Sequence, residues 1–361
     1  MHPSRTPVED IVQRPAPCRR YLPPEWASQS GVMLTWPHGH GDWAARLATV
    51  EPVFVAIARE VARRERVLIG AYDVDHSHRI QKLLRDAGVD LSRVVLRIAI
   101  SNDTWARDHG PITLLCRNDA TLLDFGFNGW GGKYPHALDK VITRRLYEAG
   151  AFGATPLETV DWVLEGGSIE VDGDGTLLTT ARCLLAPTRN PGFTRDRLEQ
   201  NLKELLGLNR ILWLNRGYLA GDDTDSHIDT LARFCNAHTI AYVACDDPAD
   251  EHYLELKSME QELQKFRTAD GTPYRLAPLP WPRAKYNEDG KRLPATYANF
   301  LVVNGAVLVP TYDDPADAAA LARLKDCFPD REIVAVDCLP LIYQFGSLHC
   351  VTMQLPAGVL T

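Results

Sequence analysis

The sequence predicts an α/β protein in which a hairpin unit repeats and closes about a common centre. From Trp26 onward, β-rich apolar runs alternate with segments of helical periodicity, which is typical of α/β folds. Four hairpins recur between the helices, each with a turn containing Asn, Asp or Gly. A polar residue that could bind or react with a ligand stands at or just before the first strand of each hairpin, at intervals of about 51 to 72 residues counted on to Cys350. This spacing predicts a divergent internal repeat whose polar groups meet in one cavity, and chance recurrence of hairpins is the alternative.

The expected helices and strands follow a loose, Pro-rich N-terminal arm of residues 1–20, and residues 21–361 are expected to form a single domain. Pro52 suits a first helical turn, Thr194 suits an N-cap, and Gly207 suits a helix end. Strands are expected at 31–36, 67–70 and 94–100, and helices at 51–64, 77–87, 137–149, 194–206, 250–266 and 315–326. The hairpins pair 111–115 with 121–125, 168–171 with 176–179, 230–234 with 239–243, and 299–303 with 306–310.

The composition is that of an ordinary globular protein, with 361 residues, 45% hydrophobic and 24% charged. The formal net charge of -8 argues against nucleic acid as a partner, because phosphate binding needs a basic surface, and is compatible with a cationic small molecule. No apolar signal core and no stretch of membrane-spanning length are present, so no membrane partner is expected. The eight cysteines form no C-x-x-C pair, which disfavours a zinc ribbon and predicts reduced thiols in a cytoplasm. The oligomeric state stays open, with a homo-oligomer among the alternatives.

The most informative feature is the dipeptide His349-Cys350, in the run Gly-Ser-Leu-His-Cys-Val-Thr-Met near the C-terminus. Cys350 follows a Gly-Ser turn and opens a short apolar run, a junction that can hold a nucleophilic thiol at a cavity wall. A lone cysteine is more often inert packing, so its meaning depends on groups elsewhere in the chain. His349 is not expected to be its catalytic partner, because adjacent strand residues point to opposite faces.

Those other groups are carboxylates and a histidine placed on the upstream hairpins. Asp108 directly precedes the first hairpin, whereas the neighbouring Arg107 fits an internal ion pair of a surface loop. Glu165 stands beside two glycines, which permit close approach of the backbone to a ligand or form a plain turn. His227 and Asp229 are two residues apart and would share one face of a strand.

The acidic loop at 222–225, just before His227, is costly unless a cation neutralises it. Calcium is one candidate, although the glycine and terminal glutamate of an EF-hand loop are missing, and an organic cation is another. A guanidinium is planar, positive and matched to carboxylates in bidentate fashion. Two carboxylates could hold it while a thiolate attacks its central carbon, and a histidine could protonate the departing ammonia and then activate water.

The chain resembles the agmatine deiminase family, which is related to bacterial peptidyl-arginine deiminases within the guanidine-modifying pentein superfamily. The resemblance runs from about residue 20 to the end. It implies a five-bladed, pseudo-fivefold α/β propeller with a central active site. The matching stretches are Trp105-Ala106-Arg107-Asp108 with Gly110-Pro111, Glu165-Gly166-Gly167, Gly221 to Asp229, Ala295 to Phe300 with Asn304-Gly305, and Leu348-His349-Cys350.

The resemblance also implies a role for each matched residue. Cys350 would be the nucleophile and His227 the general acid and base. Asp108 and Asp229 would clasp the guanidinium, and Glu165 would orient His227. The residues expected to line the substrate pocket are Trp105, Asn299, Asp223, Gly346 and Trp36.

The implied reaction is hydrolysis of agmatine to N-carbamoylputrescine and ammonia through a covalent thiouronium, with no metal or organic cofactor. The product connects the reaction with putrescine biosynthesis and polyamine metabolism. One departure concerns the loop before the cysteine, where Gln344 and Phe345 replace two glycines common in the family. That loop would border the tail of the substrate, so the substrate is less firmly predicted than the chemistry.

Several alternatives stay open. A deiminase of free or peptidyl arginine would use the same chemistry, and free arginine would need a cation for its carboxylate, with Arg107, Lys133 or Arg189 as candidates. An amidinotransferase would pass the amidino group to an amine. A catalytically inactive protein could bind a polyamine, although binding needs no thiol. A papain-like protease is disfavoured because the extra carboxylates would have no purpose.

Overall fold

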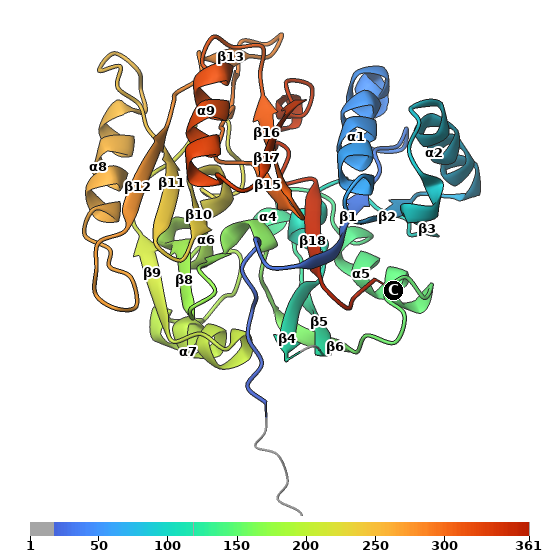
Figure 1. Ribbon diagram of the computed structural model, residues 1–361, viewed down its shortest axis with the longest axis horizontal. Helices are drawn as coiled ribbons and strands as arrows, with labels where there is room; N and C mark the ends of the chain where they lie inside the picture. The colour runs from blue at the N-terminus through green and yellow to red at the C-terminus, as the bar shows by residue number, and fades with distance from the viewer. Residues whose placement is uncertain (1–17, 118, 361) are drawn as a thin grey trace, which may run out of the picture.

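Five sheets share the arrangement of their first three strands in the computed structural model, which describes residues 18–117 and 119–360 (Figure 1). In four of them an antiparallel hairpin is followed by a helix and a third strand parallel to the second. Their strands and helices are β4 (Ile112–Cys116), β5 (Asp119–Gly126), α5 (Ile142–Glu148) and β6 (Leu157–Val163); β7 (Glu170–Val171), β8 (Thr176–Thr180), α7 (Arg195–Leu206) and β9 (Arg210–Leu214); β10 (Ala232–Asn236), β11 (Thr239–Val243), α8 (Tyr253–Leu263) and β12 (Arg275–Leu279); and β15 (Leu301–Val303), β16 (Ala306–Thr311), α9 (Asp317–Cys327) and β17 (Glu332–Asp337).

The fifth sheet is assembled from both ends of the chain. Strand β18 (Thr352–Pro356) pairs antiparallel with β1 (Gln29–Thr35), and β1 pairs parallel with β2 (Arg66–Ala71). Helix α1 (Leu47–Ala62) connects β1 to β2, and helix α2 (Val74–Asp86) leads from β2 to a fourth strand, β3 (Val94–Ile98), which pairs parallel with β2. A short hairpin of β13 (Lys285–Tyr286) and β14 (Arg292–Leu293) adds a sixth, two-stranded sheet. The predicted α/β class and the four predicted hairpins are confirmed, and the closed five-bladed arrangement stays a prediction.

Local chemistry accounts for most element ends. The Thr194 hydroxyl accepts a hydrogen bond from the Arg197 backbone at the start of α7, and Gly207 ends that helix with a left-handed φ of 69°. Asp73 caps α2 in the same way. Helix α1 begins at Leu47, four residues before the expected start, so Pro52 lies beyond its first turn.

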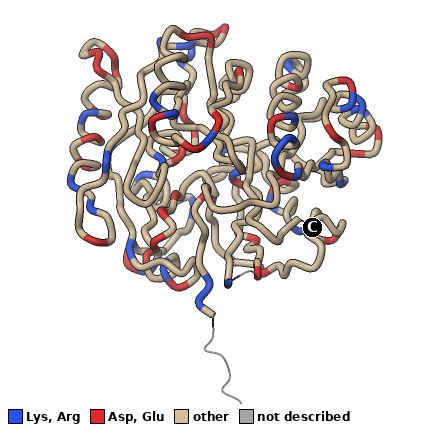
Figure 2. The backbone as a smooth tube through the Cα atoms, in the orientation of Figure 1, with Lys and Arg blue, Asp and Glu red and all other residues tan. Residues whose placement is uncertain are grey.

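The strands and the helices bury three apolar clusters, which together involve all five sheets. Helices α1, α2, α7 and α8 lie toward the outside of the molecule, while β1 and β18 run side by side nearer its middle (Figure 1). Figure 2 shows acidic and basic residues interspersed along the outer helices, with no continuous basic face in that view. Within the described ranges, no helix has the length and apolarity that crossing a bilayer would require.

The N-terminal arm is pinned to the first hairpin sheet where it can be described. Tyr21 and Leu115 exchange two backbone hydrogen bonds of 2.9 Å, which brings the Cα atoms of Cys18 and Cys116 within 5.7 Å and allows a disulfide between them. The prediction that the thiols are all reduced is therefore wrong for this pair. The other part of the predicted arm, residues 1–17, lies outside the described residues.

Candidate active site

A short turn precedes the first strand of each of the five sheets, and each turn carries a polar residue or a cysteine that could bind or react with a ligand. Asp108 lies in α3 (Ala106–His109) before β4, and Glu165 precedes the single 3₁₀ turn Gly166–Ser168 before β7. His227 and Asp229 flank Ile228 before β10, Asn299 precedes β15, and Cys350 precedes β18. These side chains are all buried.

The turns bring these groups together, as the sequence predicts. The Cys350 Sγ lies 3.8 Å from Asp229 Oδ2 and 3.4 Å from Asn299 Oδ1. The two ring nitrogens of His227 lie 3.4 Å from Glu165 Oε2 and 3.6 Å from Asp108 Oδ1. One thiol, one imidazole and three carboxylates therefore form a single cluster.

His227 and Asp229 lie close together as expected, but the structural reason for the expectation was wrong. They were expected on one face of a strand, but β10 begins only at Ala232. A hydrogen bond of 3.2 Å from the Thr230 backbone N–H to the His227 carbonyl closes a 3₁₀ turn instead. The turn lets both side chains reach the cluster before the strand starts.

Gly167 explains why two glycines follow Glu165. A Cβ atom at this position would lie 2.6 Å from His227 Nδ1, 2.9 Å from Asp108 Oδ1 and 3.2 Å from Asp229 Oδ2. The backbone N–H of Gly167 also donates a 3.0 Å hydrogen bond to Asp108. Only glycine fits at this position without displacing the reactive groups.

Asp229 is held ionised with one oxygen free. Its Oδ2 lies 2.8 Å from His349 Nδ1, which donates because an ionised carboxylate can only accept. Burial opposes the charge of Asp229, yet the His349 hydrogen bond and the nearby His349 and His227 rings keep its pKa below the usual value. Its Oδ1 is buried and has no hydrogen-bond partner among the described residues, so it is available to a ligand.

The acid–base properties of the cluster follow from its burial and its like charges. Burial disfavours a charged His227, but Asp108, Cys183 and Glu165 together raise its pKa well above the usual value. Burial, and then the nearby Asp229 and Glu165 charges, raise the pKa of Asp108 to about 6 against the opposing effect of His227.

The Cys350 thiol has a pKa well above its usual value, because it is buried beside Asp229 and Asp108. Without a bound cation the thiol is therefore protonated at neutral pH. A positive ligand between the two carboxylates would lower that pKa by offsetting their charge.

Glu165 is fixed by Arg189. The Arg189 Nε lies 3.1 Å from Glu165 Oε1, and its Nη1 pairs with Asp225. Burial raises the energy of the Glu165 charge, but hydrogen bonding to His227 and the Arg189 charge lower its pKa overall. Arg189 is thus part of the support beneath the imidazole.

A pocket of about 560 Å³, which we call the front pocket, opens onto Cys350 and Asp108. Three of the residues expected to line it do so, namely Trp105, Asp223 and Gly346. Asn299 does not line the pocket, although its Oδ1 lies 3.4 Å from the Cys350 Sγ. The complete lining is Asp42, Asp103, Trp105, Asp108, Trp130, Tyr134, Asp223, Thr224, Thr230, Gln344, Phe345, Gly346 and Cys350.

Trp36, which the sequence placed in the substrate pocket, is not among these residues. Its side chain is fully buried in the main core, where it packs on Phe54 with ring centroids 5.6 Å apart. Its indole N–H points to Glu51 at 3.4 Å. Trp36 is therefore a core residue at the end of β1.

The loop that departs from the family pattern forms one wall of the front pocket. Gln344 and Phe345 line it, and Phe345 has a left-handed φ of 67° that favours glycine. A Cβ at Gly346 would collide with the ring of Trp105, so this glycine is required. The Ser347 hydroxyl is buried 2.8 Å from Tyr312 Oη.

Two residues of the site were missed from the sequence. Cys183 is fully buried behind Glu165, with Sγ 3.8 Å from Glu165 Oε2, and Glu165, Cys183 and His227 present possible ligand atoms within 4.8 Å of one another. Glu25 lies 2.7 Å from the His349 Nε2 on the side away from Asp229. Neither residue belongs to a motif, so only the folded arrangement identifies them.

The sequence model of the Porphyromonas-type peptidyl-arginine deiminases matches residues 21–356. The chain belongs to this family. An agmatine deiminase of Pseudomonas fluorescens is 32% identical to this deiminase-family chain over 360 residues, which covers 93% of this chain and 95% of that protein.

Solved structures of deiminases share its mixed α/β fold. A Porphyromonas gingivalis protein provisionally named arginine deiminase is 51% identical, with a TM-score of 0.87, and the match covers 95% of this chain and 100% of that one. A Cys-to-Ser variant of C. jejuni agmatine deiminase with substrate bound is 37% identical, with a TM-score of 0.85, and the match covers 93% and 96% of the two chains. The predicted family relationship is confirmed.

Proposed function

We propose that this protein is a cysteine hydrolase that deiminates agmatine to N-carbamoylputrescine and ammonia. The observation that carries the proposal is the lining of the front pocket. Four aspartates border a cavity that ends at a thiol, and no Lys or Arg is among its lining residues in the described part of the chain. Agmatine is a guanidinium with a distal ammonium, so it presents a cation to each end of such a pocket.

The guanidinium would bind between Asp108 and Asp229, each of which faces the cluster. Its charge would offset theirs, and the Cys350 thiol would then lose its proton to water and attack the central carbon. His227 is protonated before the reaction and would give its proton to the departing ammonia, leaving a thiouronium on the sulfur. The neutral imidazole would then take a proton from water, whose oxygen replaces the sulfur, and the ureido product and thiol would be released.

The distal ammonium would be recognised at the mouth of the pocket by Asp103, Asp223 and Asp42. Burial raises the pKa of Asp103 to about 6, so at neutral pH it is mostly ionised. Asp223 accepts a 2.6 Å hydrogen bond from Tyr134, which fixes its position. An ammonium here is favoured by charge and by the fixed acceptors.

The three cations that could have accepted the carboxylate of free arginine are engaged elsewhere. Arg189 pairs with Glu165 and Asp225, and Lys133 lies 2.9 Å from Asp225. Arg107 is buried and lines a different cavity. Lys291 packs on the Phe345 ring, 3.7 Å from its centroid, and is not a lining residue. This arrangement favours agmatine over free arginine.

We also propose that the five similar sheets are the blades of one α/β propeller within a single domain of residues 21–361, with the cluster on its axis. The shared strand order supports this arrangement, as does the position of the reactive residue just before the first strand of each sheet.

The decisive experiment compares ureido product from agmatine, free arginine and an arginyl peptide under identical conditions. We expect agmatine to have the highest kcat/KM, and equal or greater activity on the peptide would contradict the substrate assignment. A parallel reaction with added amine tests for amidino transfer, which would yield a new guanidine in place of the ureido product.

Two cysteine variants test the nucleophile. Cys350→Ala should abolish turnover while agmatine still binds, whereas Cys183→Ala should keep most of the turnover because Cys183 does not reach the front pocket. The opposite pattern would assign the nucleophile to Cys183.

A further inference from the structure

A second cavity lies behind the catalytic cluster, and we call it the rear pocket. It shares no lining residue with the front pocket. At two places neighbouring residues of the chain face the two sides: Arg107 and Asp108, and His349 and Cys350. The catalytic wall is therefore one residue thick there, and the two cavities are separate.

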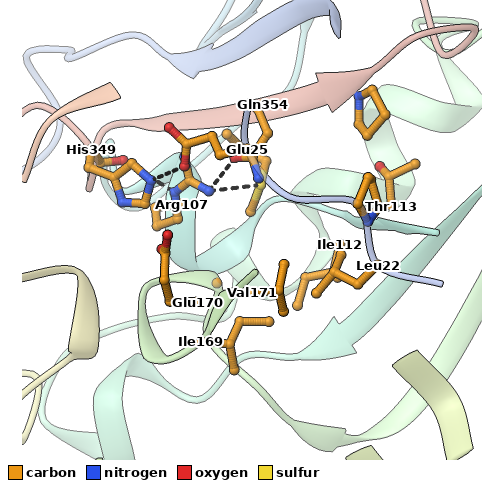
Figure 3. A pocket seen from close by; sticks show the side chains of 14 residues that line it. Leu22, Glu25, Arg107, Ile112, Thr113, Ile169, Glu170, Val171, His349 and Gln354 are labelled. Carbon is orange, nitrogen blue, oxygen red and sulfur yellow. Dashed lines mark hydrogen bonds and ion pairs between the residues drawn. The ribbon is translucent and has the colours of Figure 1, made fainter. Parts of the chain in front are cut away.

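The rear pocket has a polar end and an apolar end (Figure 3). Arg107, Glu25 and His349 gather at one end, and the side chains of Leu22 and Ile112 lie at the other. Leu22 is held over the cavity because its backbone N–H donates a 3.0 Å hydrogen bond to the Leu206 carbonyl. The charged side chains are therefore confined to one end, which suits a ligand that is charged at one end only.

The carboxylates that line the polar end already have partners. Glu25 accepts hydrogen bonds of 2.7 Å from Arg233 and from the Val302 backbone. Glu170 accepts hydrogen bonds from Arg233 at 2.6 Å and from the Phe234 backbone at 3.2 Å. Burial raises the pKa of Glu170 to about 7, so its negative charge is reduced near neutral pH. These two acids offer little to a cationic ligand.

Arg107 is different, because it retains an unused donor. Its Nη1 bonds to the Gln354 side chain and its Nε lies 3.4 Å from the His349 carbonyl, but no carboxylate forms an ion pair with it among the described residues. Its Nη2 has no hydrogen-bond partner there, although the side chain is only 3% exposed. A buried guanidinium nitrogen without an acceptor is costly, so the cavity calls for an acceptor at this point.

The hydroxyl of Thr113 is a second unpartnered group, also 3% exposed, and it lines the same cavity. Figure 3 places it away from Arg107, near Leu22. The surfaces between them are apolar and come from Ile169, Val171 and Met353. A ligand that satisfies Arg107 would therefore extend along an aliphatic wall.

We propose that the rear pocket is a binding site for a small aliphatic carboxylate. One carboxylate oxygen would accept from Arg107 Nη2, and the alkyl chain would lie against Val171 and Ile112. A guanidinium suits a carboxylate in charge and in planar geometry. A phosphate would bring more negative charge toward Glu25 than the single free nitrogen of Arg107 can offset.

Isothermal titration of the full-length protein with sodium hexanoate tests this site without any turnover, so the result is independent of the proposed deimination. We expect saturable binding of one hexanoate per chain, with hexanol, hexylammonium and inorganic phosphate each at least about ten-fold weaker. Arg107→Gln should abolish hexanoate binding. Val171→Phe narrows the apolar wall between the two ends without touching the guanidinium and should weaken binding by about ten-fold or more.

The control is Asp223→Asn, which alters the front pocket and should leave hexanoate binding unchanged. Circular dichroism and thermal unfolding establish whether each variant is folded. If Arg107→Gln does not fold, Val171→Phe still tests the site. The proposal is overturned if hexanoate shows no saturable binding, if hexanol binds equally well, or if binding survives in folded Val171→Phe and is lost in Asp223→Asn.

Discussion

Asp229→Asn should weaken the binding of the guanidinium and, at the same time, make the Cys350 thiol more acidic. In the native protein Asp229 Oδ2 is held by His349, while Oδ1 is buried and free for a guanidinium. An asparagine has one acceptor oxygen, so it can serve His349 or the substrate but not both. If its oxygen faces His349, its amide N–H groups face the cationic substrate.

The magnitude follows from burial. Asp229 is fully buried, and removing one partner of a buried charge pair costs about 3–5 kcal/mol, which corresponds to a loss of roughly 10² to 10⁴-fold in kcat/KM. The same substitution removes one of the two carboxylates that raise the pKa of the Cys350 thiol. The thiol of the free enzyme should therefore become more acidic while turnover falls.

Two assays read these effects separately. Ureido product formation from agmatine gives kcat/KM, and the pH profile of Cys350 alkylation by iodoacetamide, measured in a Cys183→Ala background, gives the pKa of the thiol. The matched control is Asp124→Asn, a buried aspartate of β5 outside the cluster, which should change neither.

A fall of less than about ten-fold in kcat/KM for a folded Asp229→Asn protein would remove Asp229 from the guanidinium clasp. An alkylation profile that stays in place or moves to higher pH would contradict the electrostatic explanation of the thiol pKa, whatever happens to turnover.

Three further predictions concern the pocket wall, the pH dependence of stability and the disulfide. Phe345→Gly relieves a positive φ but removes an apolar wall, so the KM for agmatine should rise about three- to ten-fold with little change in kcat, as steady-state kinetics would show. Burial raises the pKa of Asp139 to about 8 from 3.8, so the folded state binds this proton more tightly than the unfolded state, and the stability gained from it is lost as the pH rises from about 4 to 8. Asp139→Asn should therefore flatten the pH dependence of the free energy of unfolding in urea over that range. An unchanged pH dependence would refute the assignment. Cys18→Ser opens a link between residues 98 apart and should lower the free energy of unfolding by about 2–4 kcal/mol in oxidising buffer, with no difference from the native protein under reductant.

The sequence predicted the repeated units well because their signals are local. Turn residues such as Asn304-Gly305 and caps such as Thr194 act within a few positions, so the hairpins and α7 lie where expected. The identity of the clustered residues followed from their positions before the first strands and from the family resemblance.

What the sequence could not supply were contacts between distant segments. Cys183 reaches Glu165 only through the packing of β7 and β8, and Glu25 reaches His349 across 324 residues. Trp36 was misplaced because aromatic residues suit a pocket and a core equally well. Arg107 was expected in a surface loop but is buried. It bonds to Gln354, at the far end of the chain, and no local sequence pattern indicates this contact.

The pairing of β1 with β18 has a consequence for how activity develops during folding. Leu34 lies opposite Thr352, two residues after the candidate nucleophile, so the thiol is positioned by a contact that spans most of the chain. Contacts of such long sequence separation form slowly, because loop closure must precede any stabilising interaction. A refolding chain should therefore acquire most of its secondary structure before it acquires turnover. The delay between the recovery of secondary structure and the recovery of turnover would measure how fast β1 and β18 pair.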